Sequence, residues 1–101
     1  MHHECLGMFL LLSRYVKPAE EIDRVLPEHR AFLDRCYKSG LFIVSGPQEP
    51  RVGGVILTRD ATRAEIDAAL AEDPFVREGV SEYEIIEFKV TKQAEWFKPP
   101  A

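Results

Sequence analysis

Hydrophobic residues along the chain fall into two kinds of pattern, short apolar runs and stripes with helical spacing. Apolar runs span residues 8–15, 41–45 and 54–58, and a segment of mixed apolar and charged residues spans 82–90. Runs of this length, bounded by glycine, proline and polar residues, are typical of strands. Apolar residues recur at i, i+3, i+4 and i+7 in residues 28–39 and again in 62–72, which predicts two helices that each bury one face.

The first helical stripe is preceded by residues 19–26, which predict a short helical turn of their own. Pro27 follows this segment and has no backbone N–H to donate. We therefore expect Pro27 either to break the helix or to restart it as a first-turn residue. Gly40 is a natural end for the main helix.

The second helix carries clear signals at both ends. Thr62 and Glu65 form the pattern T-x-x-E, a capping box in which each side chain accepts a backbone N–H of the first turn. Asp73 precedes Pro74, and a residue before proline is disfavoured in helical conformation. The helix is therefore expected to end at about Glu72.

The predicted order of elements is β-α-β-β-α-β, which indicates an α+β, ferredoxin-like fold with a four-stranded antiparallel sheet and both helices on one face. Strands 8–15 and 41–45 are nevertheless apolar on both faces, whereas an antiparallel sheet with one wet face alternates. No predicted element remains to cover the second face. We therefore expect a homodimer in which sheet packs on sheet, as in a dimeric α+β barrel.

Composition limits the possible classes of protein. The 101 residues carry a formal net charge of −4, without the clustered basic residues that a nucleic-acid interface needs. No apolar run is long enough to span a membrane, and neither a signal peptide nor a disulfide between Cys5 and Cys36 is expected, so the expected location is the cytoplasm.

Residues 1–7 look like an N-terminal extension to a single domain at 8–101, with Met8 as the natural start. His2, His3 and Cys5 are read there as incidental donors, so no metal site is expected.

His29 and Asp73 are the candidate chemical residues, because each continues an apolar helical stripe with a polar side chain. The stripes otherwise consist of Phe32, Leu33, Cys36 and Tyr37 in one helix and Ile66, Ala69 and Leu70 in the other. In the predicted topology, the start of the first helix and the end of the second lie at the same edge of the sheet. A histidine whose ring N–H is held by a carboxylate can exchange protons through its other nitrogen.

Several other residues are expected at this edge and would position a small-molecule ligand. They are Arg14, Ser45, Gly46, Pro47 and Phe75, with Tyr15, Gly53, Gly54 and Tyr83 nearby. Arg14 is a candidate for binding a carboxylate. Ser45 lacks the G-x-S-x-G context of an activated nucleophile, and Tyr83 is a candidate packing residue. The sequence contains neither a P-loop nor a dinucleotide-binding glycine motif, so no cofactor is expected.

Two other interpretations fit the same residues. The histidine and the aspartate could simply satisfy each other at two helix ends, or the pocket could belong to a non-catalytic ligand-binding or interaction module. RNA binding on the open sheet face would fit the fold but not the charge, and the sheet lacks stacking aromatics.

From Met8 to about Thr91 the chain resembles the YCII-related (YciI-like) family. The resemblance rests on MFLLLSRY, PEHRAFLDRCYKSGLFIVSGP, GGVILT, AEDPF and YEIIEF, in this order and spacing. It implies a dimeric ferredoxin-like fold similar to that of muconolactone isomerases, with His29 and Asp73 as a catalytic dyad. One branch of the family is a dehydrochlorinase. The resemblance thus implies acid–base chemistry, elimination or isomerisation, on a small metabolite.

Overall fold

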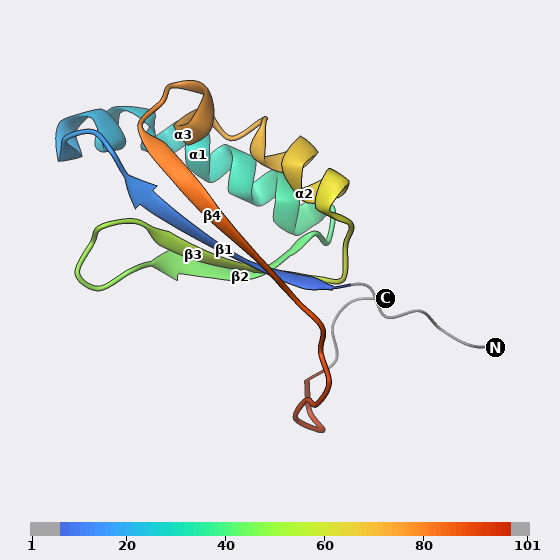
Figure 1. Ribbon diagram of the computed structural model, residues 1–101. Helices are drawn as coiled ribbons and strands as arrows, with labels where there is room; N and C mark the ends of the chain where they lie inside the picture. The colour runs from blue at the N-terminus through green and yellow to red at the C-terminus, as the bar shows by residue number, and fades with distance from the viewer. Residues whose placement is uncertain (1–6, 98–101) are drawn as a thin grey trace.

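The computed structural model describes residues 7–97, which are organised around one four-stranded sheet (Figure 1). The strands are β1 (Met8–Tyr15), β2 (Phe42–Pro47), β3 (Gly54–Thr58) and β4 (Ser81–Phe88), and the helices are α1 (Ala19–Lys38), α2 (Arg63–Leu70) and α3 (Pro74–Arg77). The strand order is β2-β3-β1-β4 with antiparallel pairing throughout. The three helices cover one face of the sheet, which confirms the predicted ferredoxin-like α+β fold. His2, His3 and Cys5 lie outside the described residues.

Helix α1 runs without interruption from Ala19 to Lys38, with Pro27 inside it. The prediction that Pro27 breaks or restarts the helix is therefore wrong. The residues before and after the proline form one continuous buried stripe, made up of Ile22, Val25, His29, Phe32 and Cys36. Burying Ile22 and Val25 contributes about 1.5–3 kcal/mol each, which offsets the roughly 3 kcal/mol that an internal proline costs.

The capping box of Thr62 and Glu65 is present at the start of α2. This helix ends at Leu70, two residues earlier than predicted. The short helix α3 then begins directly after Asp73, whose carboxylate accepts the N–H of Phe75 at 2.9 Å. The sequence pattern did not predict α3, because four residues are too few for an apolar repeat. Among residues 7–97, no helix has the length and hydrophobicity that a membrane-spanning segment needs.

Alternation along the strands separates two faces of the sheet. On β1 the side chains of Phe9, Leu11 and Ser13 are buried beneath the helices, whereas those of Leu10 and Leu12 point the opposite way. The main core lies between the helices and the sheet and includes Phe32, Phe42, Ile56 and Ile66.

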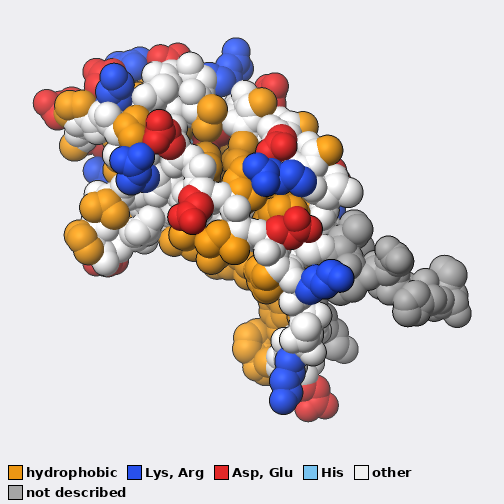
Figure 2. Space-filling model, viewed as in Figure 1, with side chains coloured by type: hydrophobic (Ala, Val, Ile, Leu, Met, Phe, Trp, Pro, Cys, Tyr) orange, Lys and Arg blue, Asp and Glu red, His pale blue; other side chains and the backbone are white. Residues whose placement is uncertain are grey.

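The face without helices is largely apolar, with Arg14, Glu82 and Glu84 at one end of it. We call it the open face, and its apolar residues are Leu10, Leu12, Val44, Leu57, Ile86 and Phe88. Val44 is 56% exposed and Ile86 38% exposed. Figure 2 shows a band of hydrophobic side chains along the lower side of the molecule, beneath the strands. The described residues contain no element that covers this face.

Candidate functional site

The structure brings His29 and Asp73 into direct contact, although they are 44 positions apart in the sequence. His29 lies in the middle of α1, and Asp73 lies in the turn between α2 and α3. His29 Nδ1 is 2.8 Å from Asp73 Oδ1. Because the carboxylate can only accept, Nδ1 carries the hydrogen and donates it. No described residue forms a hydrogen bond with Nε2, the other ring nitrogen.

Asp73 is fully buried, and its carboxylate is satisfied by three donors. Oδ1 accepts from His29 and from the backbone N–H of Phe75, and Oδ2 accepts from the hydroxyl of Tyr83 at 2.7 Å. A buried carboxylate is stable only when its oxygens are paired in this way. Asp73 therefore both caps a helix and fixes the histidine.

Tyr83 is the third member of this network and was not predicted as such. Burial raises the pKa of its phenol, and the negative charge and hydrogen bond of Asp73 raise it further. Tyr83 therefore stays neutral at physiological pH and keeps donating to the carboxylate. This arrangement makes Tyr83 a positioning residue rather than a group that exchanges protons.

Phe75 fixes the plane of the histidine ring. The two rings are stacked, with centroids 3.8 Å apart and an angle of 4° between their planes. Phe75 belongs to a small cluster of buried residues that also contains Ile22, Val25 and Val80, so it is itself held in place. His29 is thus restrained through Nδ1 and through one ring face.

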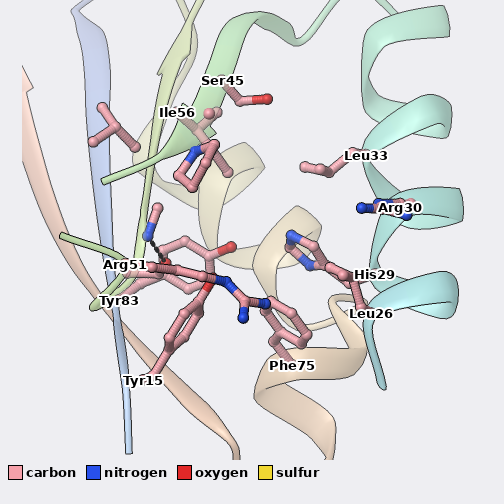
Figure 3. A pocket seen from close by; sticks show the side chains of 15 residues that line it. Tyr15, Leu26, His29, Arg30, Leu33, Ser45, Arg51, Ile56, Phe75 and Tyr83 are labelled. Atoms are coloured by element: carbon pink, nitrogen blue, oxygen red, sulfur yellow. Dashed lines mark hydrogen bonds between the residues drawn. The ribbon is translucent and has the colours of Figure 1, made fainter. Parts of the chain in front are cut away.

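A cavity of about 210 Å³ opens beside His29, between α1 and the ends of β1, β2 and β3 (Figure 3). Of the residues predicted to position a ligand, Ser45, Gly46, Pro47 and Phe75 line it. The other lining residues are Ser13, Tyr15, Leu26, Arg30, Leu33, Arg51, Gly54, Val55, Ile56 and Tyr83. Figure 3 shows His29 directed into the cavity from the helix side.

Arg14 does not line this cavity. It forms an exposed ion pair with Glu82, with 2.8 Å between the nitrogen and the oxygen. Side chains alternate along a strand, so Ser13 and Tyr15 face the helices and Arg14 faces away. Connectivity correctly placed Arg14 at this end of the sheet, but not on the side of the site.

Ser45 forms a hydrogen bond with the hydroxyl of Tyr37. Among the described residues, no hydrogen bond joins Ser45 to His29. Ser45 is therefore held as a polar wall of the cavity and lacks the contact with a base that an activated nucleophile needs.

Arg51 is the main lining residue that the sequence analysis missed. It lies in the loop between β2 and β3, which is fastened to β1 because the Tyr15 N–H donates to the Val52 carbonyl at 2.8 Å. A Cβ at Gly53 would come within 1.7 Å of the Ser13 carbonyl oxygen, so only glycine permits this close approach. The position of the loop at the predicted edge was the signal that could have identified Arg51.

Within residues 7–97, no group of three or more His, Cys, Asp or Glu side chains could hold a metal ion. The geometry instead provides one histidine with a fixed tautomer at the wall of a small, mostly apolar cavity. Such a group can accept a proton from a bound molecule and return it.

Comparison with known proteins gives a family and a fold. A search of the curated proteins finds no match. Among solved structures, the chain is similar to 5-chloro-2-hydroxyhydroquinone dehydrochlorinase from Burkholderia phenoliruptrix AC1100, determined in complex with 2,5-dihydroxybenzoquinone. The TM-score is 0.67 at 18% identity, over 81% of this chain and 93% of the other, and this likeness supports the fold. The model of the YCII-related domain matches residues 8–89, and the chain therefore belongs to the YCII-related domain family.

Proposed function

We propose that this protein is an acid–base enzyme that eliminates from, or isomerises, a small metabolite bound in the cavity beside His29. The observation that carries the proposal is the orientation of His29. Its Nδ1 donates to a fully buried carboxylate, while Nε2 lies at the wall of the cavity and forms no hydrogen bond with any residue in the described range 7–97.

In the proposed reaction, His29 Nε2 takes a proton from a carbon of the bound molecule. Asp73 holds the tautomer that leaves Nε2 unprotonated and then stabilises the imidazolium that forms. In an elimination, the electron pair of the broken C–H bond forms a double bond and a leaving group departs with its own pair. In an isomerisation, His29 returns the proton to a different carbon. Tyr83 and Phe75 hold the two side chains in position.

The similar dehydrochlorinase supports the choice of reaction class, because its name states the loss of hydrogen and chloride from a small ring compound. The cavity is also of suitable size. Its volume of about 210 Å³ is below the roughly 300–1,000 Å³ of sites for drug-sized ligands. A metabolite with one ring is therefore the expected substrate.

The proposal is tested by incubating the protein with two kinds of probe. Chloride release is measured from 5-chloro-2-hydroxyhydroquinone, and exchange of carbon-bound hydrogen with D₂O is followed by NMR for small enolisable ketones, lactones and carboxylates. We expect catalysis of at least one of these reactions. If probes bind in the cavity but none reacts faster than in buffer, the protein is a ligand-binding module instead.

We also propose that a second copy of the chain covers the open face, sheet against sheet. The face is apolar over its centre, and at 101 residues an uncovered apolar face would be costly. A twofold operator would bring Leu12 and Ile86 of both copies into one buried layer.

Ile86→Glu is expected to convert this dimer into a single chain of 11.5 kDa, because it would bury an unpaired carboxylate at the centre of the interface. Size-exclusion chromatography with light scattering measures the mass directly. Val76→Glu is the matched control, since Val76 is also 38% exposed but lies on α3, in the helix layer. A wild-type monomer, or dissociation caused equally by both variants, would contradict the proposed interface.

A further inference from the structure

The ionisable groups that line the cavity, tyrosines apart, are all basic. Arg30, Arg51 and His29 line it, and none of its described lining residues is Asp or Glu. Asp73 lies behind His29 and is fully buried, and its two oxygens already accept hydrogen bonds from three protein donors. The whole chain carries a net charge of −4. A basic cavity in an acidic protein favours a negatively charged ligand.

The walls of the same cavity are mainly apolar. Leu26, Leu33 and Ile56 line it together with the rings of Tyr15 and Phe75. Phe75 and Tyr15 are themselves packed edge to face, with centroids 6.1 Å apart. A ligand that fills this space must therefore combine a negative charge with a small apolar body, and flat molecules suit the ring-lined walls.

Arg51 is held in place before any ligand binds. Its Nη2 is 3.0 Å from Asp23 Oδ1 on α1, and its guanidinium carbon lies 5.6 Å from the centre of the Tyr15 ring. Figure 3 shows its side chain extending from the loop across the cavity, towards the helix layer. Arg30, in contrast, forms no ion pair with any described residue.

The ion pair with Asp23 is too exposed to explain Arg51 as a stabilising residue. The two side chains are 46% and 60% exposed, and pairs of this kind contribute little to folding. A guanidinium has five N–H donors, and the contact with Asp23 uses one nitrogen of the group. The guanidinium also interacts with Tyr15, and its other donors are available to a ligand.

We infer that the cavity selects a small anion with a flat apolar body, a carboxylate, phenolate or enolate, and that Arg51 binds its negative oxygen. The inference rests on the proposed function and names the class of its substrate. An anion held by Arg51 would lie with its body against His29. The same guanidinium would then stabilise the negative charge that develops as a neighbouring C–H bond loses its proton to Nε2.

The test compares 4-fluorobenzoate with 4-fluorobenzamide, which have nearly the same shape but differ in charge. Binding of each to the full chain is titrated by ¹⁹F NMR near pH 7. We expect the benzoate to bind about tenfold more tightly, since a hydrogen bond to a charged group is worth at least that factor. Arg51→Gln should weaken benzoate binding by about tenfold and leave benzamide binding unchanged.

Arg63→Gln is the matched control, because Arg63 forms a similarly exposed ion pair with Asp67 at 3.0 Å, away from the cavity on α2. Arg51→Lys keeps the charge and is expected to retain part of the benzoate preference. Thermal melts confirm that each variant is folded. Undetectable benzoate binding, equal affinity for the two probes, or the same loss in both glutamine variants would overturn the inference.

His29→Gln separates this inference from the proposed function. We expect this variant to keep the preference for 4-fluorobenzoate over 4-fluorobenzamide, because Arg51, which contacts the negative oxygen, is intact. If catalysis proves absent while the charge preference persists, the ligand class stands and the acid–base function fails. If catalysis depends on His29 but uncharged probes bind as well as charged ones, the acid–base function stands and the proposed ligand class fails.

Discussion

Asp73→Ala is expected to lower the free energy of unfolding by about 3–5 kcal/mol, the range for removing one partner of a buried ionic network. The substitution leaves three donors without an acceptor, namely the buried Nδ1–H of His29, the buried backbone N–H of Phe75 and the partly buried hydroxyl of Tyr83. It also removes the N-cap of α3. Urea denaturation of wild type and variant measures this difference. The urea concentration at the midpoint of unfolding should fall, while the dependence of the free energy on urea concentration stays the same.

Asp67→Ala provides the matched control for Asp73. Asp67 also pairs with a basic side chain at 3.0 Å, but both partners are exposed. Its replacement should change the free energy of unfolding by no more than about 0.5 kcal/mol. Equal stability of the two alanine variants would show that the buried hydrogen bonds of Asp73 do not stabilise the fold.

His29→Gln is expected to slow the reaction by at least 10²-fold, within the range of about 10²–10⁴ for loss of a general base. Glutamine can still donate a hydrogen bond to Asp73 and fill much of the space, so the fold should persist. It cannot accept and release a proton as imidazole does. The rate of chloride release or of deuterium exchange, on whichever probe the wild type turns over, gives the comparison.

Lys38→Gln serves as the control for His29→Gln, because Lys38 is exposed at the far end of the same helix. It should keep the wild-type rate. A folded His29→Gln protein with full activity would exclude the histidine as the base. A variant that instead loses more than about 3 kcal/mol of stability would assign the pair a structural role first.

Hydrophobic pattern and connectivity were sufficient to predict the architecture. The four strands and the capping box at Thr62 follow from signals within a few residues of one another. Local signals did not predict that α1 continues through Pro27, because this continuity depends on the burial of Ile22 and Val25 against distant parts of the chain. The helix α3 is defined by the cap at Asp73, which involves only three residues.

The candidate site was predictable to the level of the sheet edge. Topology predicted that His29 and Asp73 lie close together, and the structure shows them in contact. His29 nevertheless lies in the middle of α1 and not in its first turn, because the helix begins at Ala19. The direction of individual side chains was harder to predict, as Arg14 and Arg51 show. Arg14 is on the wrong side of β1, and Arg51 reaches the cavity from a loop with no periodic pattern to reveal it. The choice of Tyr83 as the third partner of Asp73 depends on packing that sequence spacing does not encode.

The double attachment of Asp73, to a helix end and to the histidine, has a consequence for the ancestry of such proteins. A descendant that lost its reaction would still be under pressure to keep this aspartate, because without it the chain would fold poorly. Such an inactive descendant could therefore retain Asp73 indefinitely. If Arg51 binds the substrate as proposed, it would distinguish active from inactive relatives better than Asp73, because the exposed arginine would matter for binding but hardly for folding.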